Sequence, residues 1–347
     1  MSQPKLNKIR RRLLAWYKKN RRDLPWRHTR DPYAIWIAET MLQQTQVKSA
    51  LPYYRRFLEA LPTLKALDRA SKEKILALWT GLGYYRRAEN LKRAARIVMR
   101  EYGGKLPREF DSLRTLPGVG PYTAGALASI AFNQAHPALD ANARRVLTRL
   151  FNVRGEKGLR DIGGRMVSRS QPGDWNQALM ELGAAICLPR MPNCRLCPAG
   201  GFCAARKLQC FESRMPSAAK RKITEVQWPL AVIKNGGKIL LRRRPPAGLL
   251  EGLWEVPGVE RKKGESLKAA LARHLNGVGR IAGPASWVGE VRHSITYRRI
   301  RAPVFFFSRY RKSPRPGSKW RWAPLSSLHR YPLSSLSLKA IKLVTQR

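Results

Sequence analysis

The cysteines constrain the fold of this chain more than any other residue type. All five of them fall within 24 residues, and none occurs in the first 186 residues or the last 137. A disulfide framework spreads its crosslinks through a fold, and an odd number of cysteines argues further against one. Clustering of this kind therefore predicts a metal site on a short loop.

The spacing of the cysteines limits which metal group the loop could hold. The ligand pattern is Cys187-x6-Cys194-x2-Cys197-x5-Cys203. Four thiolates can hold either zinc or a [4Fe–4S] cluster. Zinc ribbons usually have two separate C-x2-C pairs and this chain has one, so the spacing alone leaves both groups open. Cys210 has no place in the set, and we interpret it as a spare thiol.

The charge of the chain indicates a polyanionic partner. Its 347 residues include 68 Lys and Arg but only 22 Asp and Glu, which gives a formal net charge of +46. Nucleic acid is the first candidate for such a partner and an anionic membrane surface is the second. Because the excess is spread along the whole chain, a generally basic surface explains a share of it. Apolar residues make up 44% of the chain, which excludes a disordered basic tail.

The sequence also bears on location. It has no run of about eighteen apolar residues that could span a bilayer. The basic start has an apolar stretch too short for a signal peptide. We therefore expect a cytoplasmic, nucleoid-associated monomer.

The periodicity of the sequence predicts two domains, an all-α domain followed by a mixed α/β domain. Residues 1–210 read as helical. Asp31-Pro32 begins a helix that is predicted to end at Gln44, and Ser71 begins another. Residues 211–226 are polar and basic and are interpreted as a linker. Residues 227–347 alternate as strands do, with a tight turn at residues 235–237. Further elements are predicted for that domain: a helix over 266–275, a strand over 304–307 and a helix over 335–344. The first 210 residues carry a net charge of +24 and the remainder +22, so both domains could lie along one nucleic acid.

Residues 116–125, with the sequence LPGVGPYTAG, predict a hairpin between two helices. Gly118, Val119 and Gly120 would turn backbone N–H groups outward, and a helix would begin at Pro121 with its positive end facing the same way. Such a hairpin binds phosphate. A lone G-x-G is weak evidence, but the whole string in a strongly basic domain is strong.

Two carboxylates stand out in the first domain. Glu39 lies in an otherwise apolar helical run, where burial would raise its pKa and prepare it as a general acid. The structural alternative is that Glu39 is a helix-surface residue paired with Lys or Arg. Asp140 precedes the string ANARRVL. It is a second candidate functional carboxylate, and the structural alternative is that it only caps the N-terminus of a helix.

Several strings together carry a family resemblance: LPWR at 24–27, ETMLQQTQV at 39–47, GLGYY at 81–85, the 116–125 hairpin, LDANARR at 139–145 and the cysteine spacing. In this order they closely resemble the mismatch-specific adenine DNA glycosylases of the helix-hairpin-helix superfamily, which also contains endonuclease III. The resemblance covers residues 5–210 densely. It implies a [4Fe–4S] cluster on Cys187, Cys194, Cys197 and Cys203, and double-stranded DNA with adenine opposite 8-oxoguanine or guanine as the substrate.

The resemblance also implies roles for individual residues in removing a flipped adenine. Glu39 would protonate adenine N7, Asp140 would stabilise the sugar cation, and Tyr122 and Asn142 would position the acid and the attacking water. Trp26, Arg27, Leu42 and Glu181 would line the base pocket, while Gln44 and Tyr84 would wedge into the duplex. For Trp26, Leu42 and Tyr84 the alternative is ordinary core packing.

Tyr122 separates the branches of this superfamily. It stands where endonuclease III-like enzymes carry a lysine nucleophile, and a phenol cannot form a Schiff base with the sugar. The resemblance therefore implies a monofunctional glycosylase over a strand-cutting lyase. A non-enzymatic DNA-binding protein would lack Glu39 or Asp140, and both are present.

The second domain resembles the Nudix fold, most clearly at GLWEVPG over 252–258. The stretch 266–275 contains no carboxylate to hold Mg²⁺, which disfavours a pyrophosphatase. By resemblance the domain reads the base opposite adenine with a loop that aligns at Ile295, Thr296 and Tyr297. Many members have Phe-Ser-His at these positions. Thr296 retains the hydroxyl of the serine, and Tyr297 retains a hydrogen-bond donor in place of the histidine.

Overall fold

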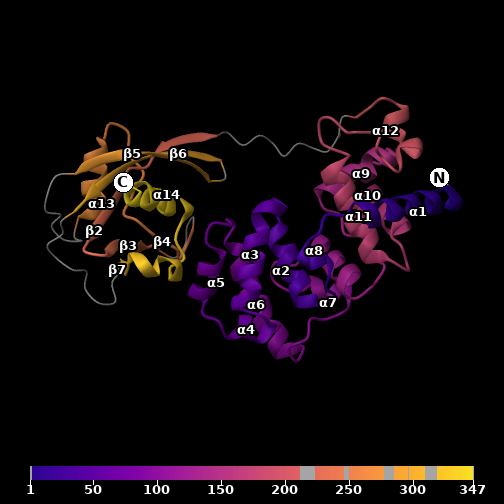
Figure 1. Cartoon of the computed structure of the whole chain (residues 1–347), viewed down its shortest axis with the longest axis horizontal. Coiled ribbons are helices and arrows are strands. Elements are labelled where there is room, and N and C mark those ends of the chain that lie inside the picture. Colours follow the sequence, from indigo (N-terminus) through magenta and orange to yellow (C-terminus); the bar gives the residue numbers. More distant parts are fainter. Residues whose placement is uncertain are drawn as a thin grey trace. The chain divides into compact units, whose positions relative to one another are not determined.

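A computed structural model describes residues 2–211, 223–245, 250–276, 285–295, 297–308 and 319–346. The chain divides into two compact units (Figure 1). One unit comprises Met1–Arg69 with Asn90–Ala218, and the other comprises Ala70–Glu89 with Ala219–Arg347. Most of the predicted linker, residues 211–226, falls on residues 212–222, which are outside the described residues. Its boundaries remain a prediction.

The first 211 residues are helical, as the sequence predicts. Their α-helices are α1 (Gln3–Asn20), α2 (Pro32–Leu42), α3 (Val47–Ala60), α4 (Leu64–Arg69), α5 (Lys72–Trp79), α6 (Arg86–Glu101), α7 (Phe110–Arg114), α8 (Pro121–Ala126), α9 (Ala141–Phe151), α10 (Gly155–Met166), α11 (Pro172–Ala185) and α12 (Ala204–Lys207). Short 3₁₀ turns lie at Pro25–Arg27 and Gly200–Phe202, and a π-helical turn at Leu127–Ala131 extends α8.

Side-chain caps explain where the helices begin. The Asp31 carboxylate accepts from the backbone N–H groups of Tyr33 and Ala34 at the start of α2, and Ser71 caps α5. The predicted end of α2 at Gln44 is wrong by two residues. The helix stops at Leu42 because Gln43 leaves the helical region with ψ of 112°, and Gln44 then adopts a left-handed backbone with φ of 57°.

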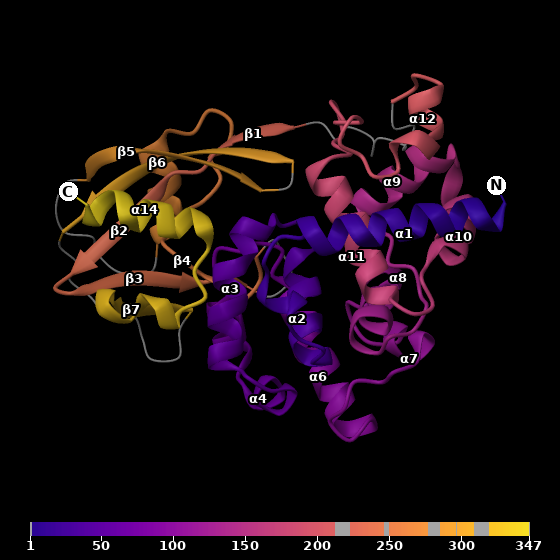
Figure 2. The same ribbon diagram turned by 45° about the vertical axis from the view of Figure 1, so that its right-hand side comes forward.

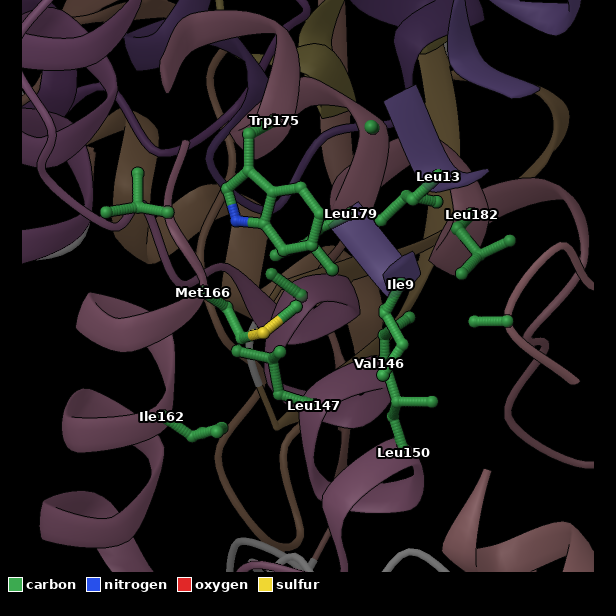
Figure 3. Packing of buried hydrophobic residues seen from close by; sticks show 14 of the residues in the cluster. Ile9, Leu13, Val146, Leu147, Leu150, Ile162, Met166, Trp175, Leu179 and Leu182 are labelled. Atoms are coloured by element: carbon green, nitrogen blue, oxygen red, sulfur yellow. The ribbon is translucent and has the colours of Figure 1, made fainter. Parts of the chain in front are cut away.

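One core joins α1 to helices α9, α10 and α11. Ile9 and Leu13 of α1 meet Val146 and Leu150 of α9, and Trp175 of α11 lies among them (Figure 3). These side chains are 3% exposed or less, so they anchor the N-terminal helix against helices that follow it by more than 120 residues. Deleting a side chain of this kind typically costs about 2–5 kcal/mol.

The second unit contains a mixed sheet, which confirms the predicted α/β character. Its strands are β1 (Thr224–Gln227), β2 (Leu230–Asn235), β3 (Lys238–Arg243), β4 (Trp254–Glu255), β5 (Ser286–Ile295), β6 (Arg298–Phe307) and β7 (Trp320–Pro324). The order is β1-β6-β2-β3-β4, with β5 paired to β6 and β7 paired to β3. Strand β6 runs parallel to β1 and β2, and the other pairs are antiparallel.

A helix covers each face of this sheet, namely α13 (Leu267–Leu275) and α14 (Ser335–Thr345) (Figure 1). Successive residues of β2 point to opposite faces. Val232 packs in the cluster that contains Ile341 of α14, whereas Ile233 packs in the cluster that contains Leu271 of α13. The predicted helices at 266–275 and 335–344 are confirmed. The 3₁₀ turn Leu325–Arg330 leads from β7 toward α14.

None of the helices in the described ranges combines the length and the apolar character needed to cross a bilayer.

Candidate active site

Glu39 and Tyr122 form the centre of the site. Glu39 lies in the fully buried run of α2 and is 4% exposed. The Tyr122 hydroxyl, on the first turn of α8, donates to Glu39 Oε2 at 2.5 Å. Burial raises the pKa of Glu39 to about 7, against the lowering effect of the Tyr122 hydrogen bond. The alternative of a surface-paired Glu39 is wrong, and the carboxyl is poised to give a proton near neutral pH.

Asp140 caps helix α9 and also meets Asn142. Its Oδ1 accepts from the backbone N–H of Ala143 at 2.6 Å, which confirms the capping interpretation. Its Oδ2 accepts from Asn142 Nδ2 at 3.1 Å, so the cap leaves a second oxygen available to the site. Burial raises the pKa of Asp140, and the charge of Asp140 in turn raises the pKa of Glu39. The two carboxylates therefore share one electrostatic environment.

A buried arginine fixes the side chain of Asn142 by a hydrogen bond. Arg145 Nη2 donates to Asn142 Oδ1 and to the Gly183 carbonyl, both at 2.8 Å. Gly183 is needed where α11 crosses α9, because a Cβ there would lie 2.5 Å from the Asn142 Cβ. Sequence reasoning missed both residues. The glycine in the string MELGAA, at position 183, was the sequence signal that α11 could approach another helix closely.

Glu181, the third carboxylate of the site, is buried. Arg22 Nε reaches Glu181 Oε1 at 2.7 Å, and Arg27 Nη2 reaches Oε2 at 2.5 Å. Burial acts to raise the pKa of Glu181, but the hydrogen bonds from Arg22 and Arg27 outweigh it and lower the pKa. Glu181 thus remains ionised at neutral pH, where a substantial fraction of Glu39 is protonated. Arg22 was missed because it lies in a basic run that reads as surface.

The remaining pocket residues differ in exposure. Trp26 is 5% exposed and meets the Tyr54 ring edge-on at 5.1 Å, as core packing predicts. Leu42 is half-buried at the end of α2. Arg27 has a 6% exposed side chain, and its buried Nε has no hydrogen-bond partner among the described residues.

The predicted hairpin lies between α7 and α8. Gly118 has φ of 83°, and a Cβ there would lie 2.8 Å from the Asn90 Cβ. Val119 is 5% exposed and anchors the turn, while Gly118 and Gly120 are exposed. The turn thus presents backbone outward, as a phosphate contact requires.

Gln44 and Tyr84 are both exposed residues with left-handed backbones, at φ of 57° and 49°. Such a conformation is uncommon outside glycine and costs free energy unless the surroundings hold it. Tyr84 is 56% exposed, so the core-packing alternative is wrong for it. Arg87 Nη2 supports its loop by donating to the Gly83 carbonyl at 3.0 Å.

The predicted cysteine ligands share one loop beside the helical core, whereas Cys210 is exposed. Burial raises the pKa of the Cys197 thiol to about 11, and the charges of Cys187, Cys203 and Cys194 raise it further. The four sulfur atoms therefore lie within electrostatic reach of one another. In the part of the chain that the structure describes, no three His, Cys, Asp or Glu side chains are placed to share a single metal ion.

The predicted opposite-base loop is the turn of a β-hairpin. Ile295 ends β5, Arg298 begins β6, and Tyr297 between them is 42% exposed. Thr296 lies outside the described residues. Helix α13 begins at the Ser266 cap and carries no carboxylate, as predicted.

Comparison with known proteins supplies two family matches. Residues 37–163 match the HhH-GPD superfamily of base excision DNA repair proteins, and residues 230–343 match the NUDIX domain. Among solved structures, a thermostable thymine-DNA glycosylase aligns with a TM-score of 0.56 at 33% identity, covering 59% of this chain and 98% of the other. Endonuclease III in a trapped covalent intermediate with DNA aligns at 0.53 and 21% identity, over 60% of this chain and 99% of the other, which shows the fold alone.

Full-length relatives are similar over both domains. The adenine DNA glycosylase of Rattus norvegicus is 36% identical over 378 residues, covering 90% of this chain and 73% of the relative. The adenine DNA glycosylase of Homo sapiens is 35% identical, covering 89% of this chain and 69% of the relative. The resemblance drawn from the sequence motifs is thereby confirmed, and this chain belongs to the adenine DNA glycosylase family of base excision repair.

Proposed function

We propose that this protein hydrolyses the N-glycosidic bond of adenine opposite 8-oxoguanine or guanine, without cutting the strand. The observation that carries the proposal is the buried Glu39, with a pKa of about 7 and a 2.5 Å hydrogen bond from Tyr122. A carboxyl with this pKa is protonated in about half of the molecules at neutral pH. It can therefore donate a proton to adenine N7 once the base has left the stack.

The other polar groups stabilise the charge that develops as the base leaves. Asp140 offers a carboxylate to the sugar cation, and its position is held by the Ala143 N–H and the Asn142 amide. Pre-oriented charge of this kind is worth more in a dry site than in water. Asn142 also positions the attacking water. The ion pair of Glu181 with Arg27 forms part of the wall of the proposed base pocket.

Cleavage of defined duplexes tests this function. Duplexes carrying adenine opposite 8-oxoguanine, guanine or thymine are incubated with the protein and analysed with and without hot alkali. We expect strand breaks for the first two duplexes and only after alkali. Breaks without alkali, together with borohydride trapping of a Schiff base, would establish a lyase. Asp140→Asn should bind the duplex and lose excision; retained excision would leave Asp140 as a cap alone.

A [4Fe–4S] cluster on Cys187, Cys194, Cys197 and Cys203 is part of the proposal. The four thiols share one loop and lie within electrostatic reach of one another. Four cysteine thiolates are the usual ligands of such a cluster, and the family resemblance favours it over zinc. When bound, the cluster would tie the cysteine loop together. Iron analysis of anaerobically purified protein tests it, and stoichiometric zinc would refute it.

We further propose that the hairpin at Ile295–Tyr297 reads the base opposite adenine. Support comes from its exposed position at the tip of β5 and β6 and from the hydroxyl of Tyr297. Tyr297→Ala should lower the ratio of single-turnover rates for 8-oxoguanine over guanine duplexes. Because base contacts carry specificity and phosphate contacts carry affinity, the salt dependence of binding should hardly change. An unchanged ratio would assign the reading to the catalytic domain.

A further inference from the structure

A basic groove lies between α1, along its length from Gln3 to Lys18, and the segment that joins α10 to α11. Its volume is about 1140 Å³. Five cations line it and no carboxylate does: Arg10, Arg11, Lys18, Arg165 and Arg169. The polar side chains of Ser168 and Gln171 complete the wall beneath them. None of these residues belongs to the active site.

The groove runs along most of α1, whereas the arginines that pair with Glu181 follow the C-terminal end of that helix. Helices α1 and α11 run beside each other (Figure 2). At one end Arg10 Nε donates to the Met166 carbonyl at 3.0 Å, and at the other Arg22 reaches Glu181 at 2.7 Å. Gln171 precedes Glu181 by ten residues, which corresponds to about 15 Å along a helix. A molecule in the groove therefore does not occupy the base pocket.

Three of the five cations carry a charge that no carboxylate among the described residues neutralises. Arg10 donates hydrogen bonds to the Asn7 side chain and to the backbone carbonyls of Met166 and Arg165. Arg11, Lys18 and Arg169 make no ion pair within the described ranges and are exposed to solvent. Burial lowers the pKa of Arg10, and the charge of Arg169 lowers it further. Like charges held together in this way favour an anion between them.

The dimensions of the groove favour a polymer. It is larger than the roughly 300–1,000 Å³ of a small-molecule pocket. Arg11 and Lys18 are seven residues apart on α1, which places them about 10.5 Å apart along its axis. Three base-pair steps of a duplex span about 10.2 Å at 3.4 Å per phosphate of one strand. We propose that this groove binds the phosphodiester backbone of DNA, either the flank of the duplex under repair or a second duplex.

Charge reversal on the full-length protein tests this second DNA contact. R11E/R169E is compared with K65E/K157E, which makes the same change in net charge at exposed lysines of α4 and α10 that have no ion pair among the described residues. Affinity for undamaged 12- and 40-base-pair duplexes is measured over a series of salt concentrations. For R11E/R169E we expect the magnitude of the salt slope to fall by about 2 and the affinity to fall about tenfold or more. R11Q/R169Q should give a smaller loss in the same direction.

The two duplex lengths and a bridging assay separate the two sources of phosphate. A defect confined to the 40-base-pair duplex assigns the groove to the flank of the bound DNA. In the bridging assay, one protein that binds two differently labelled duplexes gives energy transfer between them. Loss of this energy transfer in R11E/R169E assigns the groove to a second duplex. Either result supports the proposal. The proposal is overturned if R11E/R169E, at equal thermal stability, loses no more affinity for DNA than K65E/K157E does. It is also overturned if R11E/R169E loses binding to a polyglutamate peptide while it still binds DNA.

The same experiment is independent of the proposed base specificity. The single-turnover excision rate at saturating duplex should stay within about twofold, since both substituted residues lie outside the base pocket. If excision of adenine is absent from the unsubstituted protein, the proposed function fails while the affinity comparison on undamaged DNA remains valid.

Discussion

Replacing Glu39 by glutamine should stabilise the protein while it removes base excision. Burial raises the pKa of Glu39 from 4.5 to about 7. The folded protein therefore holds a proton that the unfolded chain releases above pH 4.5. Each pKa unit corresponds to about 1.36 kcal/mol, so ionising Glu39 in the folded state costs about 3 kcal/mol at pH 8. Glutamine is uncharged and does not incur this cost.

The pH dependence of the difference follows from the direction of the shift. Because the folded pKa is raised, the contribution of Glu39 to stability is greatest below pH 4.5 and is lost as pH rises through about 7. The variant lacks this loss. Its advantage in the free energy of unfolding should therefore grow by roughly 2.5 kcal/mol between pH 5 and pH 8. For a domain of this size that corresponds to roughly 5–10 °C in Tm.

Calorimetry of both proteins from pH 5 to pH 8 measures the difference. Glu181→Gln is the matched control, because it makes the same chemical change at a carboxylate whose pKa is lowered by Arg22 and Arg27. Removing that partner leaves the largely buried Arg27 uncompensated, so this variant should lose stability at pH 8. An E39Q Tm at pH 8 equal to or below the parent value would refute the reasoning. So would a difference that does not shrink toward pH 5.

Three further predictions concern neighbouring positions. Tyr122→Phe removes a hydrogen bond that lowers the pKa of Glu39, so the alkaline limb of the pH–rate profile should move to higher pH in single-turnover assays. Gly183→Ala should slow excision and lower Tm, because its Cβ would overlap α9, whereas Gly158→Ala has only ordinary contacts and should be neutral or stabilising. Cys187→Ala should reduce bound iron and 400 nm absorbance, and exposed Cys210→Ala should leave both unchanged.

Local signals were sufficient to predict most elements of the fold. The Asp31 and Ser71 caps mark helix starts that the structure confirms. Strand β6 was predicted only over 304–307 but begins at Arg298. Its first half carries three arginines, which mask the alternation that marks a half-buried strand. The paired strand β5 was missed because its polar residues and Gly289 break the same pattern.

The site divides in a similar way. The apolar neighbours of Glu39 in sequence suggested its burial but left the surface alternative open, and the family resemblance favoured burial. Its partner Tyr122 lies 83 residues away, and only the family resemblance placed the two together. The contacts made by Arg22 and Gly183 depend on how α11 approaches α1 and α9. No local pattern encodes such an approach, because it is set by the packing of the shared core.

Buried arginines show that the large positive charge has a second purpose besides attracting DNA. Arg87, Arg145 and Arg149 are each 8% exposed or less. A buried cation needs partners, and carboxylates are scarce in this chain. Backbone carbonyls replace them: Arg149 donates to those of Leu188, Pro189 and Phe211, and Arg145 donates to that of Cys187.

The loops held in this way are those that carry candidate functional residues. Arg87 supports the loop of the exposed Tyr84, Arg145 holds Asn142, and Arg149 holds the start of the cysteine loop. A guanidinium suits this task because its rigid fork of five donors can bind several carbonyls at once, while a lysine has a single flexible ammonium. The same residue type therefore supplies long-range attraction to DNA at the surface and fixes loop geometry in the interior. Composition cannot separate the two uses, since only burial distinguishes Arg149 from the arginines of the basic groove.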